Sequence, residues 1–171
     1  MKLLATIKSI DVNPKAKNLD YDKFTPRIAA RVVLLENKKV ALIYVSAHNY
    51  YMLPGGGIDD DNIETGLKRE VREEVGCEIE ILEEIGYTRL YFDRWATLQT
   101  DYCYMAKAVS SGIELARTDF EESEGYKIVW ANDINQAIEL VKTADPKEDD
   151  GKIVRARDLL FLETANARLI T

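Results

Sequence analysis

Three glutamates spaced along one predicted helix have the side chains needed to hold a divalent metal ion. They are Glu70, Glu73 and Glu74, in the charged run at residues 69–76. If residues 62–75 form a helix, with about 100° between successive residues, Glu70 and Glu74 project beside its apolar stripe. Two carboxylates next to a buried stripe repel each other and resist losing water unless a cation neutralises them. Oxygen ligands of this kind suit Mg²⁺ or Mn²⁺, so the segment predicts a metal site.

These glutamates belong to a longer motif with fixed spacing. It reads Gly55, five residues, Asp61, seven residues, Arg69-Glu70-Val71, one residue, Glu73-Glu74, one residue, Gly76-Cys77. The pattern closely resembles the Nudix box, the signature of hydrolases that cleave nucleoside diphosphates linked to another group. Asp61 and Cys77 depart from it, since the family usually has Glu and a branched aliphatic residue there. The stretch before Arg69 is also one residue shorter than usual.

The resemblance implies an α/β fold and a reaction. The fold is a Nudix-type α/β/α sandwich with a mixed β-sheet, in which the box forms loop, helix and loop. The reaction is substitution at phosphorus: Mg²⁺, or Mn²⁺ in its place, held by Glu70, Glu73 and Glu74, would bind a diphosphate bridge and lower the pKa of the attacking water. Arg69 would orient one of these glutamates, so the resemblance implies a catalytic set of Arg69, Glu73 and Glu74.

The glycine run before the helix has two explanations. Considered alone, it is best read as a tight turn, because glycines adopt backbone angles that other residues resist. The resemblance implies instead that the loop shapes the metal site and contacts substrate through Gly55, Gly56 and Gly57. A P-loop is disfavoured because no Gly-Lys-Ser/Thr sequence follows.

Simpler structural roles compete for several charged residues. Asp61 with Glu64 fits a capping box at the start of the helix, and we favour that role over metal binding. Arg69 could pair with Glu73 on an exposed face, as residues four apart do. Glu73 also points furthest from the apolar stripe.

A further carboxylate often comes from a distant loop in this family. The acidic segment at residues 119–124 supplies the candidates Glu121 and Glu122. A solvated acidic loop is the alternative explanation. His48 is the only histidine, and its neighbours predict a loop residue, so any general base is expected to be a carboxylate or a metal-bound water.

Composition limits the class of protein. The net charge is −7, with 30 acidic and 23 basic residues, which argues against binding a nucleic acid polymer. It does not argue against a nucleotide-like small-molecule substrate, because metal ions can bridge acidic protein to phosphate. With 171 residues and 46% hydrophobic content, residues 1–171 are expected to form a single Nudix hydrolase domain.

The same sequence predicts no membrane span and a reducing compartment. The apolar stretch at residues 28–45 is interrupted by the polar residues 36–39, and the first residues turn polar at Lys8, too early for a secretion signal. Cys77 and Cys103 are too few for a disulfide framework or a zinc site. We expect a cytoplasmic protein.

Hydrophobic patterning predicts a mixed sheet with helices on both faces. The first ten residues are expected to form a strand, and so are residues 25–35, 39–46, 78–92, 95–109 and 126–131. A short turn should join the second and third of these strands in a hairpin, and the fourth and fifth should pair across residues 93–94. Helices are expected at residues 62–75, after an Asp133 cap, and at residues 152–167.

The last helix is basic within an acidic chain. The basic residues are Lys152, Arg155, Arg157 and Arg168, and a solvated face is the expected explanation. A homodimer contact and a contact with substrate are the alternatives.

Substrate identity is not selected by the sequence. Aromatic residues that could stack on a base, although core packing is favoured for them, are Tyr87, Tyr91, Trp95, Tyr102 and Tyr104. Arginines suited to phosphate or base contacts are Arg27, Arg31, Arg89 and Arg94.

Two hypotheses about function follow. The first is a Mg²⁺-dependent hydrolase that cleaves the pyrophosphate linkage of a nucleoside diphosphate derivative. The second is a non-catalytic Nudix module that binds and senses a nucleotide-like ligand, and it is motivated by Asp61, Cys77 and the shortened loop.

Overall fold

The computed structural model describes residues 1–17, 19–59 and 62–169 of the chain. Within these ranges one sheet contains the strands β1 (Leu3–Lys8), β2 (Thr25–Glu36), β3 (Lys39–Val45), β4 (Tyr50–Met52), β5 (Glu78–Phe92), β6 (Thr97–Ser110) and β7 (Tyr126–Ala131). The helices are α1 (Ser9–Val12), α2 (Ile63–Val75), α3 (Asp119–Ser123), α4 (Ile134–Thr143) and α5 (Asp149–Leu169). Two 3₁₀ turns are also present, η1 (Tyr21–Lys23) and η2 (Asp93–Trp95).

The sheet is mixed, as predicted. Its strand order is β1-β5-β6-β2-β3-β4, and β7 pairs with β3. The β1–β5 and β2–β6 pairs are parallel, whereas the other pairs are antiparallel. The predicted hairpin between β2 and β3 is confirmed. Its turn residues Asn37 and Lys38 have φ values of 50° and 77°, the left-handed angles that a tight two-residue hairpin turn requires.

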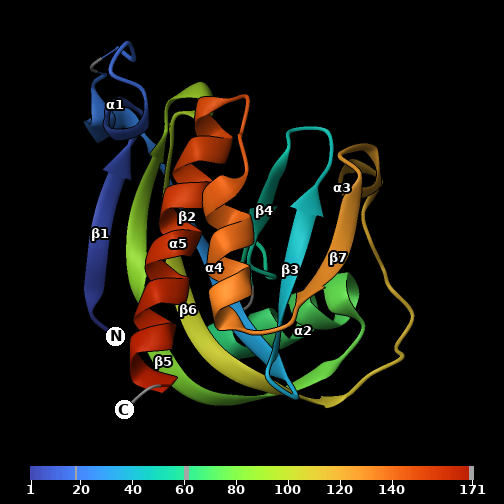
Figure 1. The fold of residues 1–171 in the computed structure, drawn as a ribbon. Coiled ribbons are helices and arrows are strands. Elements are labelled where there is room, and N and C mark those ends of the chain that lie inside the picture. Colours follow the sequence, from blue (N-terminus) through green and yellow to red (C-terminus); the bar gives the residue numbers. More distant parts are fainter. Residues whose placement is uncertain (18, 60–61, 170–171) are drawn as a thin grey trace.

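Helices cover both faces of the sheet (Figure 1). Helices α4 and α5 lie on one face and α2 lies on the other. Alternation along β2 explains this arrangement, because neighbouring strand residues point to opposite faces. Val32 and Leu34 pack in the cluster that contains Leu67 of α2, while Val33 packs in the cluster that contains Phe161 of α5. The α/β/α sandwich is therefore confirmed.

Two differences from the predicted elements concern boundaries and short helices. Helix α5 begins at Asp149, three residues before the predicted start. The strand expected over the first ten residues ends at Lys8, because α1 begins at Ser9, and no helix was predicted there or at α3. Helix α3 forms because Thr118 and Glu121 make a capping box at its start. No helix in the described ranges is long and apolar enough to cross a membrane.

Candidate active site

Helix α2 is fixed at both ends by its own sequence. At the start, the Asn62 side chain accepts a hydrogen bond from the Thr65 amide at 3.0 Å. Asp61, the predicted cap, lies outside the described residues, and the cap that the structure describes is Asn62 instead. At the other end Gly76 adopts the left-handed conformation, with φ 75°, that commonly terminates a helix. These two caps fix where the helix begins and ends, and the apolar stripe with Leu67 and Val71 packs on the sheet.

The glycine loop lies along β2. The Pro54 and Gly56 carbonyls accept hydrogen bonds from the Val32 and Ala30 amides, both at 3.0 Å. Gly55 has φ 122°, and a Cβ atom there would overlap the Ala30 carbonyl, so both its backbone angle and its close approach require glycine. Gly55 thus has a backbone angle that favours glycine, as the tight-turn explanation requires, but the segment runs alongside β2 instead of closing a turn. Its backbone also lies against α2, where the Gly55 amide meets Glu74.

Glu74 is the most deeply buried glutamate of the box. Its side chain lies at the loop, where Oε2 accepts a hydrogen bond from the Gly55 amide at 2.7 Å. Only 3% of the residue is exposed. Burial raises the pKa of the Glu74 carboxyl to about 8, although the Gly55 hydrogen bond and the Arg31 guanidinium oppose the shift. An ionised carboxylate at this position would be stabilised by a cation.

Glu70 lies next to Glu74, and Glu73 faces outward. A Cβ atom on Gly56 would overlap the Glu70 carboxylate, so this side chain also reaches the glycine loop. Burial raises the pKa of Glu70, partly offset by Arg69. Nη1 of Arg69 lies 2.7 Å from Glu70 Oε1 and 3.2 Å from Glu73 Oε2, so Arg69 contacts both glutamates. Arg69 is therefore placed to orient Glu70 while it pairs with Glu73.

The two carboxylates suit an open Mg²⁺ site better than a site whose ligands all come from protein side chains. In the described ranges, no three acidic, histidine or cysteine side chains stand together as a ready ligand set. Mg²⁺ is commonly bound by one or two protein carboxylates, with water and substrate phosphates completing its shell. Glu70 and Glu74 match this requirement, because both are withdrawn from water beside the backbone of the loop.

The acidic segment at α3 lies near this pair. The charge of Glu121 contributes to the raised pKa of Glu74, so the two groups interact, but Glu121 Oε2 also accepts the Thr118 amide at 2.7 Å as the cap of α3. Glu122 is exposed. Glu124 Oε2 lies 2.6 Å from His48 Nε2, and both residues line a cavity next to α3. The segment is thus a short capped helix at the mouth of a cavity rather than a loop.

A cavity of about 560 Å³ opens beside the glycine loop. Of the four arginines that the sequence left equal, Arg27, Arg31 and Arg94 line it, whereas Arg89 is exposed and is not part of its wall. Arg31 donates a hydrogen bond to the Gly55 carbonyl. A Cβ atom on Gly57 would approach Nη2 of Arg27 to 2.6 Å. The cavity wall therefore meets the glycine loop through two guanidinium groups.

The aromatic candidates separate into core residues and one cavity residue. Tyr104 is buried, and the rings of Tyr87 and Tyr102 pack with centroids 5.6 Å apart. Tyr91 packs against Tyr21 and Phe24. Core packing is thus confirmed for Tyr104 and Tyr102, whereas the half-buried Tyr87 and Tyr91 pack against neighbouring rings outside the core clusters. It is wrong for Trp95, which is 63% exposed and lines the cavity. The cavity also contains aromatic residues that the sequence did not single out, namely Tyr50, Phe92, Phe120 and Tyr126.

A buried charge network supports the cavity from the side of α5. Arg157 is fully buried, and its guanidinium lies 3.0 Å from Asp101 and 2.7 Å from Asp158. Arg31 also pairs with Asp101, at 3.1 Å. Asp158 accepts the Leu53 amide at 3.0 Å, one residue before Pro54. The network therefore ties α5 to β2, β6 and the start of the glycine loop.

The expected solvated face is wrong for Arg157. Ile153, Arg157, Phe161 and Ala165 are four apart, so Arg157 lies within the buried stripe of α5. This spacing is the sequence signal that could have revealed its burial. A long charged side chain in such a stripe needs a buried partner, and Asp101 on β6 provides it.

Comparison with known proteins agrees with the geometry. The NUDIX domain family model matches residues 25–152. A NUDIX hydrolase from Nitrosomonas europaea superposes with a TM-score of 0.61 at 15% identity, covering 84% of this chain and 90% of that one. The MutT protein from Methanosarcina mazei Go1 has a TM-score of 0.59 at 16% identity, covering 85% and 97%. A UDP-X diphosphatase has a TM-score of 0.57 at 13% identity, covering 92% and 69%.

No curated protein matches the chain in sequence. The solved structures establish the fold, and the domain match extends from the start of β2 to the first turn of α5. It includes the glycine loop, α2 and β2, the strand that carries both Arg27 and Arg31. The chain belongs to the Nudix hydrolase family.

Proposed function

We propose that the protein is a Mg²⁺-dependent hydrolase that cleaves the diphosphate linkage of a nucleoside diphosphate derivative by attack of water on phosphorus. The observation that carries this proposal is the pair Glu70 and Glu74, withdrawn from water against the glycine loop. Arg27 and Arg31 of the cavity wall lie against the same loop. Of the two hypotheses drawn from the sequence, this one explains why carboxylates lie where burial opposes their charge.

Each residue of the site has a chemical role in this proposal. Bound Mg²⁺, or Mn²⁺, held by Glu70 and Glu74 with Glu73 at the exposed side, would supply an activated water and neutralise phosphate charge. Arg69 orients Glu70 through its ion pair. The loop of Gly55, Gly56 and Gly57 fixes the carboxylates and borders the phosphates.

Residues outside the box complete the site. Arg27 and Arg31 line the cavity and can donate hydrogen bonds to phosphate oxygens. Glu121 is the better placed of the two additional carboxylates proposed from α3, since its charge acts on Glu74. Glu122 remains the second candidate.

The named relatives support the substrate class. One solved neighbour is a UDP-X diphosphatase and another is an ADP-ribose pyrophosphatase from Streptococcus suis, and both names describe nucleoside diphosphate derivatives. We propose a nucleotide-like small molecule as substrate for this chain too. That residues 1–171 act as a single cytoplasmic domain also remains a proposal.

The position of Cys77 does not support the non-catalytic hypothesis. Cys77 is 2% exposed and packs in the cluster between α2 and the sheet, where an aliphatic side chain would serve the same purpose. This departure from the motif therefore lies in the core and not among the charged groups.

Hydrolysis of a defined panel tests the proposal. The chain is incubated with Mg²⁺ and nucleotide sugars, dinucleotides, oxidised nucleotides or ADP-ribose in ¹⁸O-labelled water, and products are analysed by mass spectrometry. We expect one class to be cleaved, with the label in a phosphate product, and chelation of the metal to abolish turnover.

Matched variants provide the control. Glu74→Gln should remove activity, while Glu64→Gln, an exposed residue in the first turn of the same helix, should retain it. Absence of turnover for every compound, with the same outcome in Glu74→Gln, would count against a hydrolase.

A further inference from the structure

Three arginines line the cavity beside the glycine loop, and they differ in what holds them. Arg31 donates to the Gly55 carbonyl from Nη1, and its Nε donates to Asp101 Oδ1 at 3.1 Å. Its side chain is 11% exposed. Arg27, four residues earlier on β2, is exposed and lies against Gly57. The guanidinium group of Arg31 is therefore held at two points, one of which is the backbone of the loop.

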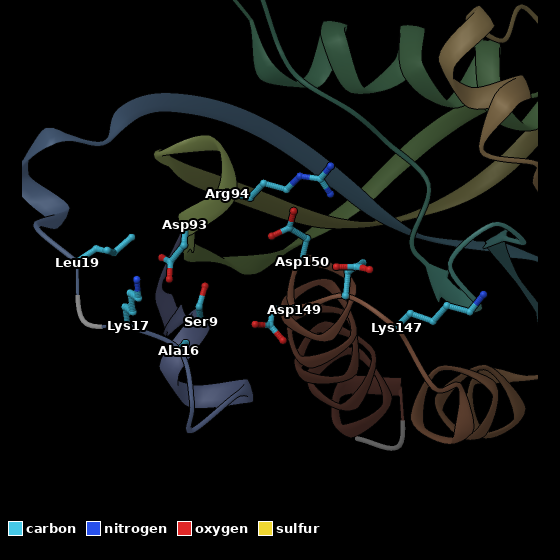
Figure 2. A pocket seen from close by; sticks show the side chains of 10 residues that line it. Ser9, Ala16, Lys17, Leu19, Asp93, Arg94, Lys147, Asp149 and Asp150 are labelled. Carbon is cyan, nitrogen blue, oxygen red and sulfur yellow. The ribbon is translucent and has the colours of Figure 1, made fainter.

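Arg94, the third arginine, is held by a different part of the molecule. Cζ of its guanidinium group lies 4.8 Å from the centroid of the Trp95 ring, and its charge acts on Asp150. It also lines a second cavity, of about 440 Å³, where Figure 2 shows it beside Asp150. One wall of that cavity belongs to the N-terminal segment and another to the start of α5. Arg94 therefore serves as a comparison for Arg31.

The peptide unit that joins Gly55 to Gly56 lies between the backbone contacts of the two buried carboxylates. The Gly55 amide donates to Glu74 Oε2 at 2.7 Å, and a Cβ atom on Gly56 would overlap the Glu70 carboxylate. The oxygen of this peptide unit is the Gly55 carbonyl, which accepts the hydrogen bond from Arg31. Arg31 thus fixes the backbone at the point where the loop meets both glutamates.

Glycine on both sides leaves this peptide unit free to rotate unless its carbonyl is held. The carbonyls of Pro54 and Gly56, before and after it, accept hydrogen bonds from β2 amides. The Gly55 carbonyl between them is bonded to a side chain instead. A guanidinium group suits this task, because Asp101 fixes Nε and the planar group then directs Nη1. Rotation of the peptide unit would move the backbone away from the carboxylates.

We propose that Arg31 is a positioning residue for the candidate metal site: it fixes the Gly55–Gly56 peptide unit and thereby holds Glu70 and Glu74 in place for the ion. The inference rests on the proposed function, because it assigns a task within that site. This task needs no substrate, so it is separate from the phosphate contact proposed for the same side chain.

The sign of a change in metal affinity tests the inference. The charge of Arg31 acts on Glu70 and Glu74, so removing it should, by charge alone, tighten the binding of a divalent cation. Loss of positioning should weaken that binding. Mn²⁺ is titrated without substrate and followed by electron paramagnetic resonance. We expect the Kd to rise about tenfold in Arg31→Lys, which keeps the charge but lacks the planar fork. Arg31→Met should also bind more weakly.

Matched replacements in the same cavity wall provide the control. Arg27→Lys and Arg94→Lys should leave the Kd for Mn²⁺ unchanged, since neither side chain holds the Gly55 carbonyl. With substrate, Arg31→Lys should lower kcat, whereas Arg27→Lys should raise KM. Unchanged Mn²⁺ affinity in Arg31→Lys, tighter binding in Arg31→Met, or equal weakening in all three lysine variants would overturn the inference.

Hydrogen exchange of the metal-free protein keeps the two proposals separable. If wild type hydrolyses no compound and binds no Mn²⁺, the proposed function fails, and the Gly55 amide decides the inference on its own. Protection of this amide in wild type, Arg27→Lys and Arg94→Lys, lost in Arg31→Lys, supports the positioning role. An amide that is unprotected in wild type, or equally protected in wild type and Arg31→Lys, overturns it. The wild-type measurement holds even if a variant does not fold.

Discussion

Glu74 and Asp101 are both buried carboxylates, but their surroundings differ in charge. Burial alone would raise the pKa of either group. At Asp101 the guanidinium groups of Arg157 and Arg31 outweigh burial and hold the pKa below its ordinary value. At Glu74 the opposing contacts are weaker, and burial raises the pKa to about 8. One carboxylate is neutralised within the protein, and the other is left for a cation from outside.

This difference separates a structural charge from the charge that we propose to be functional. Asp101 completes a network in which Arg157 and Asp158 join α5 to the strand before the glycine loop. Glu74 has a backbone donor but no ion pair of its own in the described ranges. Asp101, which two guanidinium groups neutralise, therefore serves the fold, whereas Glu74, which has no ion pair in the described ranges, is a candidate metal ligand.

The largest expected effect comes from Glu74→Gln. Because the amide cannot ionise to hold Mg²⁺, kcat should fall by about a thousandfold or more. Gln can still accept the Gly55 hydrogen bond, so in metal-free buffer at pH 8 the variant should be at least as stable as wild type. Enzyme assays and urea unfolding measure the two effects. A strong loss of stability would show that Glu74, like Asp101, is a structural charge.

Arg157→Met should lower stability, in contrast to Glu74→Gln, which should lower activity and leave stability intact. Leaving Asp101 and Asp158 buried without this guanidinium is expected to lower the free energy of unfolding by about 3–5 kcal/mol. Arg155→Met is the matched control two residues earlier, where Arg155 donates to the Ala144 carbonyl from a partly buried position, and about 1 kcal/mol or less is expected. Chemical denaturation compares them. Equal losses for the two variants would contradict a special role for the network.

Metal-free protein should show the contrast between the two carboxylates as a pH dependence. The pKa of Glu74 is raised from 4.5 to about 8, so the folded state holds its proton through this window and the unfolded state does not. Stability from this group is full below 4.5 and is lost as pH rises toward 8, by about 2–4 kcal/mol. Asp101 behaves oppositely: its lowered pKa stabilises the fold above 3.8, and that stabilisation is lost in acid.

Unfolding of wild type and Glu74→Gln across this range, with chelator present, isolates the Glu74 contribution as the difference between the two curves. Added Mg²⁺ should remove most of the alkaline loss in wild type, because a bound ion stabilises the folded state. Parallel curves for the two proteins would show that Glu74 does not titrate in this window.

The smallest effect is expected for Glu73→Gln. Glu73 pairs with Arg69 on the outer side of α2, and its side chain is 37% exposed, so its carboxylate carries a small burial penalty. We expect kcat to fall by about tenfold and the stability to change by about 0.5 kcal/mol or less. Steady-state kinetics beside Glu74→Gln gives the ranking. If kcat fell equally in Glu73→Gln and Glu74→Gln, Glu73 would be as important to the reaction as Glu74.

Sequence reasoning recovered the site most fully where the chemistry is local. Successive turns of one helix bring Glu70 and Glu74 to the same side, and the glycines next to them are adjacent in the chain. The pairing of β5 with β6 also followed from two long β-rich runs separated by a short turn. These features depend on residues close in sequence, so periodicity is sufficient to predict them.

The errors fall on residues whose surroundings come from elsewhere in the chain. Trp95 was expected in the core because it belongs to a β-rich run, but it lies in the 3₁₀ turn η2 and faces a cavity. Arg157 was expected on a solvated face because most arginines are. Its burial depends on Asp101, 56 residues away in the chain.

By itself, the sequence determined the helix of the box, the Asp133 cap of α4, the hairpins and the family. Those features follow from spacing, turn residues and apolar alternation, all of which act over a few residues. Only the tertiary structure decided which carboxylate is neutralised internally and which arginines line the cavity. It also showed that the segment at residues 1–24 forms one wall of a second cavity. The charge balance inside a protein depends on which distant segments are in contact, and local sequence patterns do not specify those contacts.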